Sequence, residues 1–183
     1  MADIFVGGFG DGGMLARSIV ADYQKTYAKT HVGSVYFEWT SSEDIVKYLD
    51  KLSLDEAINL IGHSYGGDTA GVIAARYKRR INVLATIDPV GHTGTGTMNL
   101  MKGNCTVWVD VNAVPEWHGG LSNLAAGIGG AWNEKPKGIA TFYIEAPVDH
   151  EAFSQLVNYP GKDGQTATMI LEQYRVIGPA SEK

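Results

Sequence analysis

The chain has 183 residues, with 20 acidic and 15 basic side chains and a formal net charge of −5 at pH 7. A chain of this length can bury a substantial core without disulfides or metals, so we expect one domain spanning residues 1–183. The charges are mixed along the sequence, with one basic run at 78–80, which excludes the basic surface typical of nucleic-acid-binding proteins.

The chain contains a single cysteine, Cys105, which excludes a disulfide framework and a multi-cysteine zinc site. Its first residues, MADIFVGGFGDGG, lack the basic and long apolar regions of a cleavable signal peptide. No apolar segment approaches the roughly 20 residues that a transmembrane helix needs. We therefore expect a soluble protein that is cytoplasmic or exported without a cleavable signal, and the sequence leaves its oligomeric state open.

Short apolar runs alternate with longer segments of helical period along the chain. The runs are apolar on both faces, as buried parallel strands are. The predicted strands span residues 3–6, 34–38, 57–61, 81–87, 105–111 and 139–144. The predicted helices span residues 14–29, 42–51, 65–79, 149–157 and 165–176. This alternation predicts an α/β three-layer sandwich with a mostly parallel six-stranded sheet.

Two segments interrupt the alternation, at residues 91–103 and 112–138. The second is longer than loops in compact domains usually are, which favours a functional cover loop. If its apolar residues face a site, they would suit an acyl chain; if not, they close the core beneath the connection. The candidate substrate-binding residues in this segment are Trp117, Leu121, Leu124 and Trp132, with Ile128 beside them.

The sequence INLIGHSYGGDTA, at residues 58–70, places Ser64 between a predicted strand and a predicted helix. The spacing Gly-x-Ser-x-Gly is weak evidence by itself in a chain with 23 glycines. Its position is stronger evidence, because a serine at a sharp strand-to-helix turn stands clear of the sheet at the helix N-terminus. We therefore predict that Ser64 is a nucleophile.

A serine nucleophile needs a base that removes its proton. His150 directly follows the last predicted strand, and in a parallel sheet the loops after the strands share one edge with Ser64. His150 is therefore the preferred base, while His92 and His118 lie on the same edge and remain competitors. His63 is held beside Ser64 within the turn, and His31 lies at the opposite edge.

The base needs an orienting carboxylate on a rigid element facing the same edge. Asp88 ends an apolar strand in INVLATIDPVG, where a charge is costly unless it is paired. Asp110, on the next strand, and Asp149, beside His150, remain alternatives. The preferred triad is therefore Ser64, His150 and Asp88.

The glycine-rich turn in DIFVGGFGDGG follows the first predicted strand. Backbone N–H groups of Phe9 and Tyr65 are the expected oxyanion-hole donors. Gly8, Gly10 and Gly13 also match the Gly-x-Gly-x-x-Gly spacing of dinucleotide-binding loops, although no ribose-binding acid ends the second strand in the usual way. A dinucleotide-binding protein therefore remains an alternative.

These residues together resemble the α/β-hydrolase superfamily in its lipase, esterase and thioesterase branches. The matching pieces are VGGFG as oxyanion turn, GHSYGG as nucleophile elbow, IDPVG as acid strand and APVDH as histidine loop. The resemblance implies a minimal form that lacks the family's two N-terminal strands, with strand order 2-1-3-4-5-6. The family's acid usually follows the next strand along, which keeps Asp110 as an alternative.

The resemblance implies a serine hydrolase that cleaves a carboxylic ester, either a lipid or other acyl ester or a thioester. No cofactor or metal is expected, and the expected partner is a small-molecule or lipid ester. A non-catalytic binding module with the same fold is the main alternative. The sequence does not identify the physiological substrate.

Overall fold

The computed structural model describes residues 1–11, 18–115 and 129–177. Within these residues, six parallel strands form one sheet with the order β2-β1-β3-β4-β5-β6, which confirms the predicted order. The strands are β1 (Ala2–Gly7), β2 (Val35–Glu38), β3 (Ile58–His63), β4 (Ile81–Ile87), β5 (Cys105–Ala113) and β6 (Phe142–Ala146). The helices are α1 (Ile19–Tyr27), α2 (Ser42–Lys51), α3 (Tyr65–Arg76), α4 (Thr95–Asn104), α6 (Phe153–Val157) and α7 (Ala167–Ile177).

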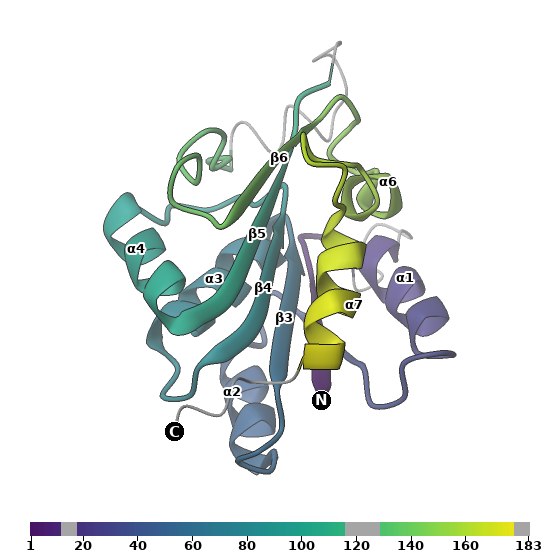
Figure 1. Ribbon diagram of the computed structural model, residues 1–183, viewed down its shortest axis with the longest axis vertical. Coiled ribbons are helices and arrows are strands. Elements are labelled where there is room, and N and C mark those ends of the chain that lie inside the picture. Colours follow the sequence, from purple (N-terminus) through teal and green to yellow (C-terminus); the bar gives the residue numbers. More distant parts are fainter. Residues whose placement is uncertain (12–17, 116–128, 178–183) are drawn as a thin grey trace.

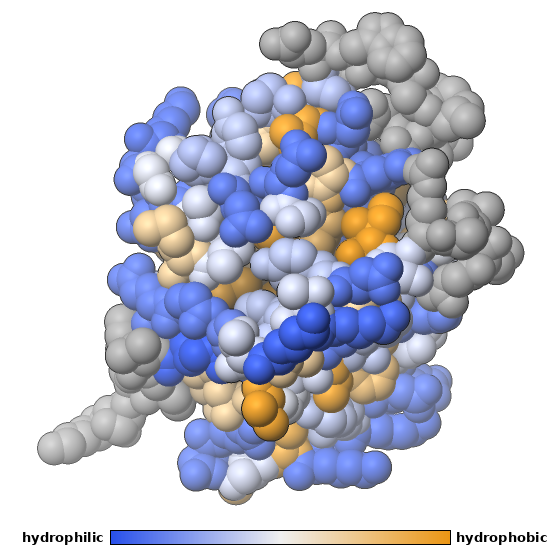
Figure 2. Space-filling model, turned by 90° about the vertical axis from the view of Figure 1, so that its right-hand side faces the viewer, coloured by the Kyte–Doolittle hydropathy of each residue, from blue (hydrophilic) through white to orange (hydrophobic). Residues whose placement is uncertain are grey.

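Helices cover both faces of the sheet, which makes a three-layer α/β sandwich (Figure 1). Side chains of α2, α3 and α4 join one buried apolar cluster with alternate residues of the strands. Side chains of α1, α6 and α7 join a second cluster on the other face. Burying the apolar side chains of both sheet faces is the main stabilising contribution in such a sandwich. Figure 2 shows that hydrophilic residues cover most of the outer surface on the side that carries α1.

The predicted strands and helices agree with the structure in type, and several ends differ. Strand β6 begins at Phe142 instead of residue 139, and α6 begins at Phe153 instead of residue 149. The part of the first predicted helix before residue 18 lies outside the described residues, and the described part ends at Tyr27. The turn at residues 149–152 takes the place of the start of a helix and carries His150.

Helix α4 was not predicted, because its glycine-rich sequence TGTMNLMKGN has low helix propensity. Met98 and Met101 are both fully buried in the cluster under α3. Two buried methionines one turn apart give this segment an apolar face, and packing of that face compensates for the weak propensity. Here tertiary burial decided the local structure.

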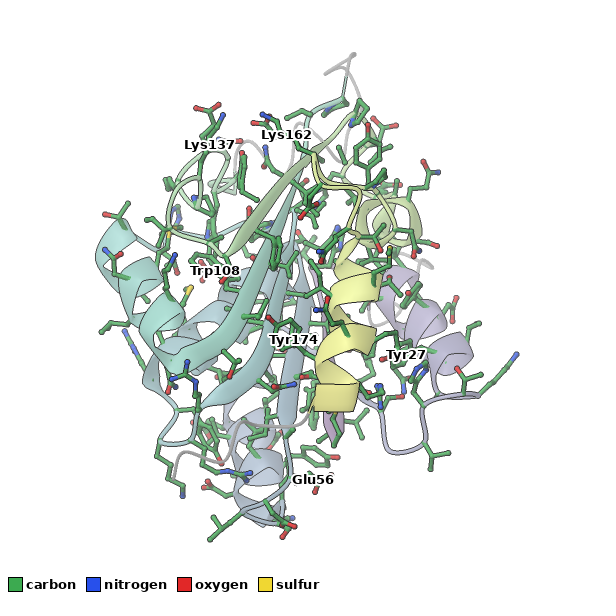
Figure 3. All side chains as sticks on the ribbon, viewed as in Figure 1. Tyr27, Glu56, Trp108, Lys137, Lys162 and Tyr174 are labelled. Atoms are coloured by element: carbon green, nitrogen blue, oxygen red, sulfur yellow. The ribbon has the colours of Figure 1, made fainter. Side chains whose placement is uncertain are left out.

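A row of buried polar side chains crosses the sheet near the start of β1, β3 and β4. Asn59 Nδ2 donates to Asp3 Oδ1 at 2.8 Å, and Asn82 Nδ2 donates to Asn59 Oδ1 at 3.0 Å. Arg175 on α7 forms an ion pair with Asp3, and its Nη2 donates to the hydroxyl of Tyr27 at 2.7 Å. These contacts fix α1 and α7 on the sheet, and Figure 3 labels Tyr27 and Tyr174 on these two helices.

None of the helices in the described part of the chain is long and apolar enough to cross a membrane. Cys105 is 3 % exposed, and burial raises the pKa of its thiol to about 12. A thiol with such a high pKa is a poor nucleophile at neutral pH. Cys105 therefore belongs to the core.

Candidate functional site

Ser64 occupies the sharp turn between β3 and α3 and is the N-cap residue of that helix. Its backbone has φ 55° and ψ −128°, a conformation that residues other than glycine rarely adopt. Ser64 N donates to Ile87 O at 3.1 Å, and Ser64 O accepts from Gly67 N at 2.9 Å and from Val90 N at 3.0 Å. These hydrogen bonds hold the strained turn against β4 and its following loop.

The glycines around Ser64 are required by backbone packing. A Cβ atom on Gly62 would lie 2.2 Å from Gly66 O, and one on Gly66 would lie 2.2 Å from Val6 O. Real Cβ atoms do not approach backbone oxygen so closely, so only glycine fits at either position. The Gly-x-Ser-x-Gly spacing therefore has a physical cause here, namely the close approach of β1, β3 and α3.

His150 connects Ser64 to Asp88. Ser64 Oγ lies 2.9 Å from His150 Nε2, and His150 Nδ1 lies 2.5 Å from Asp88 Oδ2. A carboxylate only accepts, so Nδ1 carries the ring proton and Nε2 accepts a hydrogen bond from the serine hydroxyl. The three residues are 5 %, 8 % and 6 % exposed for Ser64, His150 and Asp88, so bulk water competes little with these hydrogen bonds.

Asp88 is fixed at the end of β4 through both its backbone and its side chain. Its backbone N donates to Val111 O at 2.6 Å, and Ala113 N donates to its Oδ1 at 3.0 Å. The backbone of Asp88 has φ 42°, again in the left-handed region. The neighbouring strand β5 therefore orients the carboxylate, and the other oxygen remains directed at His150.

Asp110, the main alternative acid, lies elsewhere. Its Oδ1 accepts from Thr86 Oγ1 at 2.5 Å, and Thr86 Oγ1 accepts from Trp108 Nε1 at 2.9 Å. Burial, together with the nearby charge of Asp88, raises the pKa of Asp110 to about 8. Asp110 is therefore a buried, protonated acid at neutral pH that bonds within the sheet, while Asp88 contacts His150.

The remaining histidines take different places. His92 is exposed, and His118 lies outside the described residues. His31 Nε2 lies 2.9 Å from Glu172 Oε1, beside the polar row near the start of the strands. His63 lies next to the site, where its Nε2 contacts the backbone oxygen of His150 at 2.7 Å. The sequence places His63 beside Ser64 within the turn and assigns it no role.

The turn after β1 lies directly against the nucleophile. Asp11 N donates to Gly8 O at 3.2 Å, and Gly10 has φ 81°, which together describe a type II turn with Phe9 at its first central position. A Cβ atom on Gly8 would lie 2.6 Å from Ser64 Cβ. Gly8 therefore packs against Ser64, and the rest of the Gly-x-Gly-x-x-Gly segment, from residue 12 to Gly13, lies outside the described residues.

The carboxylate of Asp11 anchors the same turn, a feature that sequence reasoning missed. Asp11 is 4 % exposed, and its Oδ1 accepts from Val20 N at 3.0 Å in the first turn of α1. Burial is the main cause that raises the pKa of Asp11, while this hydrogen bond and the Tyr36 hydroxyl lower it. The turn after β1 is thus tied to α1.

Of the candidate substrate-binding residues, only Trp132 is described. It is fully buried, its ring meets that of Trp108 edge to face at 6.3 Å, and its Nε1 donates to Asp68 Oδ1 at 3.0 Å. These contacts place Trp132 in the core, so we do not include it in the proposed substrate site. The other three candidates, Trp117, Leu121 and Leu124, lie outside the described residues.

The geometry suits nucleophilic chemistry at Ser64. A buried hydroxyl faces an imidazole nitrogen, and the imidazole is oriented by a carboxylate that is itself held in place. Among the residues described, no group of three or more histidine, cysteine, aspartate or glutamate side chains could hold a metal ion.

Comparison with known proteins identified one family model. This model, described as the alpha/beta hydrolase fold, matches residues 8–117, which is more than half of the chain. The match includes Ser64 and Asp88 and ends before His150. No curated protein and no solved structure matched the chain.

Proposed function

The chain belongs to the α/β-hydrolase family, and from this premise we propose that it is a serine hydrolase that cleaves carboxylic esters through an acyl-Ser64 intermediate. The observation that carries the proposal is the hydrogen-bonded series from Ser64 through His150 to Asp88. In the proposed reaction, His150 Nε2 removes the proton from Ser64 Oγ as the oxygen attacks the ester carbonyl carbon. Asp88 stabilises the imidazolium that forms and does not itself become protonated.

Collapse of the tetrahedral intermediate breaks the ester bond, and His150 returns the proton to the leaving alcohol or thiol. Water, activated by the same imidazole, then attacks the acyl-enzyme and releases the acid and free Ser64. The sequence of steps uses one base twice, so it requires that His150 stay within hydrogen-bond distance of both the serine and the incoming water.

The negative charge on the carbonyl oxygen needs donors that already point at it. We propose the backbone N–H groups of Phe9 and Tyr65 for this role. Tyr65 N is the first N–H after the nucleophile at the N-terminus of α3, where the helix dipole favours negative charge. The close approach of Gly8 to Ser64 brings the turn that contains Phe9 against the nucleophile.

We propose an apolar acyl group, from a lipid or other acyl ester or from a thioester, as the substrate. Phe9 is 59 % exposed and lies within the turn that packs against Ser64. Val114 is 39 % exposed and follows Ala113, whose N–H contacts Asp88. Exposed apolar side chains beside the reacting groups favour an apolar substrate over a sugar. The predicted start of the cover loop at residue 112 is wrong, because Asn112 and Ala113 belong to β5 and pair with β6. We propose residues 114–138 as the cover loop, of which 116–128 lie outside the described residues.

A fluorophosphonate probe, which reacts covalently with activated serines, tests the proposal. Wild type is expected to be labelled, Ser64→Ala is expected not to be labelled, and the control Ser53→Ala, which changes an exposed serine, is expected to behave as wild type. Absence of labelling in a folded wild-type protein would favour the alternative, a non-catalytic binding module. A series of p-nitrophenyl esters then tests the acyl group, and preference for acetate over longer chains would contradict an apolar acyl site.

A further inference from the structure

His63 is a buried titratable group in contact with the site that the proposed reaction does not use. It is the last residue of β3, directly before Ser64, and it is 4 % exposed. Its ring lies 4.8 Å from the ring of His150, tilted by 32°, and 5.5 Å from the ring of Phe153 on α6. The side chain of His63 therefore contacts the segment that carries His150 from the end of β3.

The contact between His63 and His150 is a hydrogen bond of known direction. His63 Nε2 lies 2.7 Å from the backbone oxygen of His150, and a carbonyl oxygen only accepts. His63 Nε2 therefore carries a proton and donates it. Burial, with a smaller contribution from the neighbouring His150, lowers the pKa of His63 to about 4, so the ring is neutral at physiological pH.

The segment that carries His150 lies outside the helices and strands. Residues 147–152 lie between β6 and α6 and form turns without a regular helix or strand. Hydrogen bonds from Val148 N to Ala146 O, from Ala152 N to Asp149 O and from Phe153 N to Glu151 O fold this segment on itself. The hydrogen bond from His63 instead joins the segment to the sheet.

We propose that His63 is a positioning residue that fixes the backbone of His150 relative to Ser64. The proposal rests on the proposed function, since it deepens the role of the same site. Two consecutive residues then hold His150 at two points: Ser64 at Nε2 of the ring, 2.9 Å away, and His63 at the backbone oxygen, 2.7 Å away. The end of β3 therefore positions both the nucleophile, Ser64, and the base, His150.

A neutral donor suits this position better than a cationic one. His150 gains a positive charge when it takes the serine proton, and a second cation 4.8 Å away in a buried site would oppose that charge. A lysine or arginine could also donate to the carbonyl, but its charge would remain. A buried neutral imidazole donates a hydrogen bond without that repulsion.

Three variants separate the hydrogen bond from simple packing. In His63→Gln, the side-chain amide N–H lies nearly as far from the backbone as the imidazole Nε2 and can reach the backbone oxygen of His150. The shorter side chain of His63→Asn cannot reach this oxygen, and His63→Leu has no donor. The proposal expects His63→Gln to keep kcat within about 3-fold of wild type, and the other two variants to lose about 10- to 100-fold in kcat with KM nearly unchanged. Circular dichroism verifies that each variant folds. If His63→Leu does not fold, the comparison of kcat between His63→Asn and His63→Gln tests the proposal.

Proton NMR provides a readout that does not depend on turnover. The proton between His150 Nδ1 and Asp88 Oδ2, across 2.5 Å, should give a far-downfield resonance. The proposal expects this resonance to persist in wild type and His63→Gln and to broaden or vanish in His63→Asn and His63→Leu. It is overturned if folded His63→Asn or His63→Leu keeps both the resonance and wild-type kcat, or if His63→Gln loses as much as they do.

The two proposals fail in different ways. If the wild type hydrolyses no ester of the series and resists the fluorophosphonate probe, the proposed function fails. The NMR resonance then still decides whether His63 positions His150, because it reports geometry and not chemistry.

Discussion

His150 Nδ1 lies 2.5 Å from Asp88 Oδ2, which joins the turn after β6 to the end of β4. The two residues are 62 positions apart in the sequence, and both are almost fully buried. This contact selects one carboxylate among the acidic residues at this edge of the sheet. It also sets the tautomer of the imidazole that faces Ser64.

Exchange of the two carboxylates for amides separates their roles. Asp88→Asn is expected to lower kcat by about four orders of magnitude, because the amide favours the wrong imidazole tautomer and cannot stabilise the imidazolium. Asp110→Asn is expected to keep kcat within about 10-fold of wild type, because Asp110 bonds to Thr86 and not to His150. Turnover of a p-nitrophenyl ester by both purified variants measures the difference. A large loss confined to Asp110→Asn would contradict the assignment of Asp88.

The elbow glycines can be tested by adding one methyl group. Gly66→Ala would place its Cβ 2.2 Å from Val6 O, so we expect loss of the folded protein or a fall in its free energy of unfolding by more than about 3 kcal/mol. Gly96→Ala is the control, because its Cβ meets open space in α4 and alanine favours helix by about 1 kcal/mol. Thermal unfolding followed by circular dichroism compares the two. Equal stability of both variants would mean that the elbow is not packed as described.

The stability of the protein should fall in acid because of His63. Its pKa is lowered from 6.5 to about 4 in the folded state, so the unfolded chain binds more protons between these values. The contribution is present above about pH 6.5 and is lost as the pH falls to about 4, amounting to about 3 kcal/mol. His63→Gln should remove this dependence. Urea unfolding at several pH values measures it, and parallel curves for wild type and variant would contradict a buried neutral His63.

Asp110 should give the opposite dependence on pH. Its pKa is raised from 3.8 to about 8 in the folded state, so the folded protein binds more protons between these values and loses stability as the pH rises through this range. Asp110→Asn does not titrate, so its stability relative to wild type should increase from pH 4 to pH 8. Melting temperatures across this range check the sign. A relative stability that falls with pH would indicate that Asp110 is ionised in the folded protein.

Much of this arrangement could be predicted from the sequence because the signals are local. Runs that are apolar on both faces predicted six buried parallel strands, and the structure has that sheet in the predicted order. The strand-to-helix context of Ser64 likewise comes from adjacent residues. Helix α4 could not be predicted, because its weak propensity is overcome by the burial of Met98 and Met101 against other elements.

The sequence by itself determined the alternation of strands and helices, the elbow at Ser64 and a short set of candidate bases and acids, because periodicity and glycine spacing are properties of neighbouring residues. The strand order was implied by the resemblance to the α/β-hydrolase superfamily. Only the tertiary structure showed that Asp88 contacts His150 while Asp110 bonds to Thr86, brought His63 to the backbone of His150, and placed Trp132 in the core. These outcomes depend on which strand ends and turns meet in space. Direction, distance and burial of a side chain arise from packing between segments far apart in the chain, and a linear pattern does not contain them.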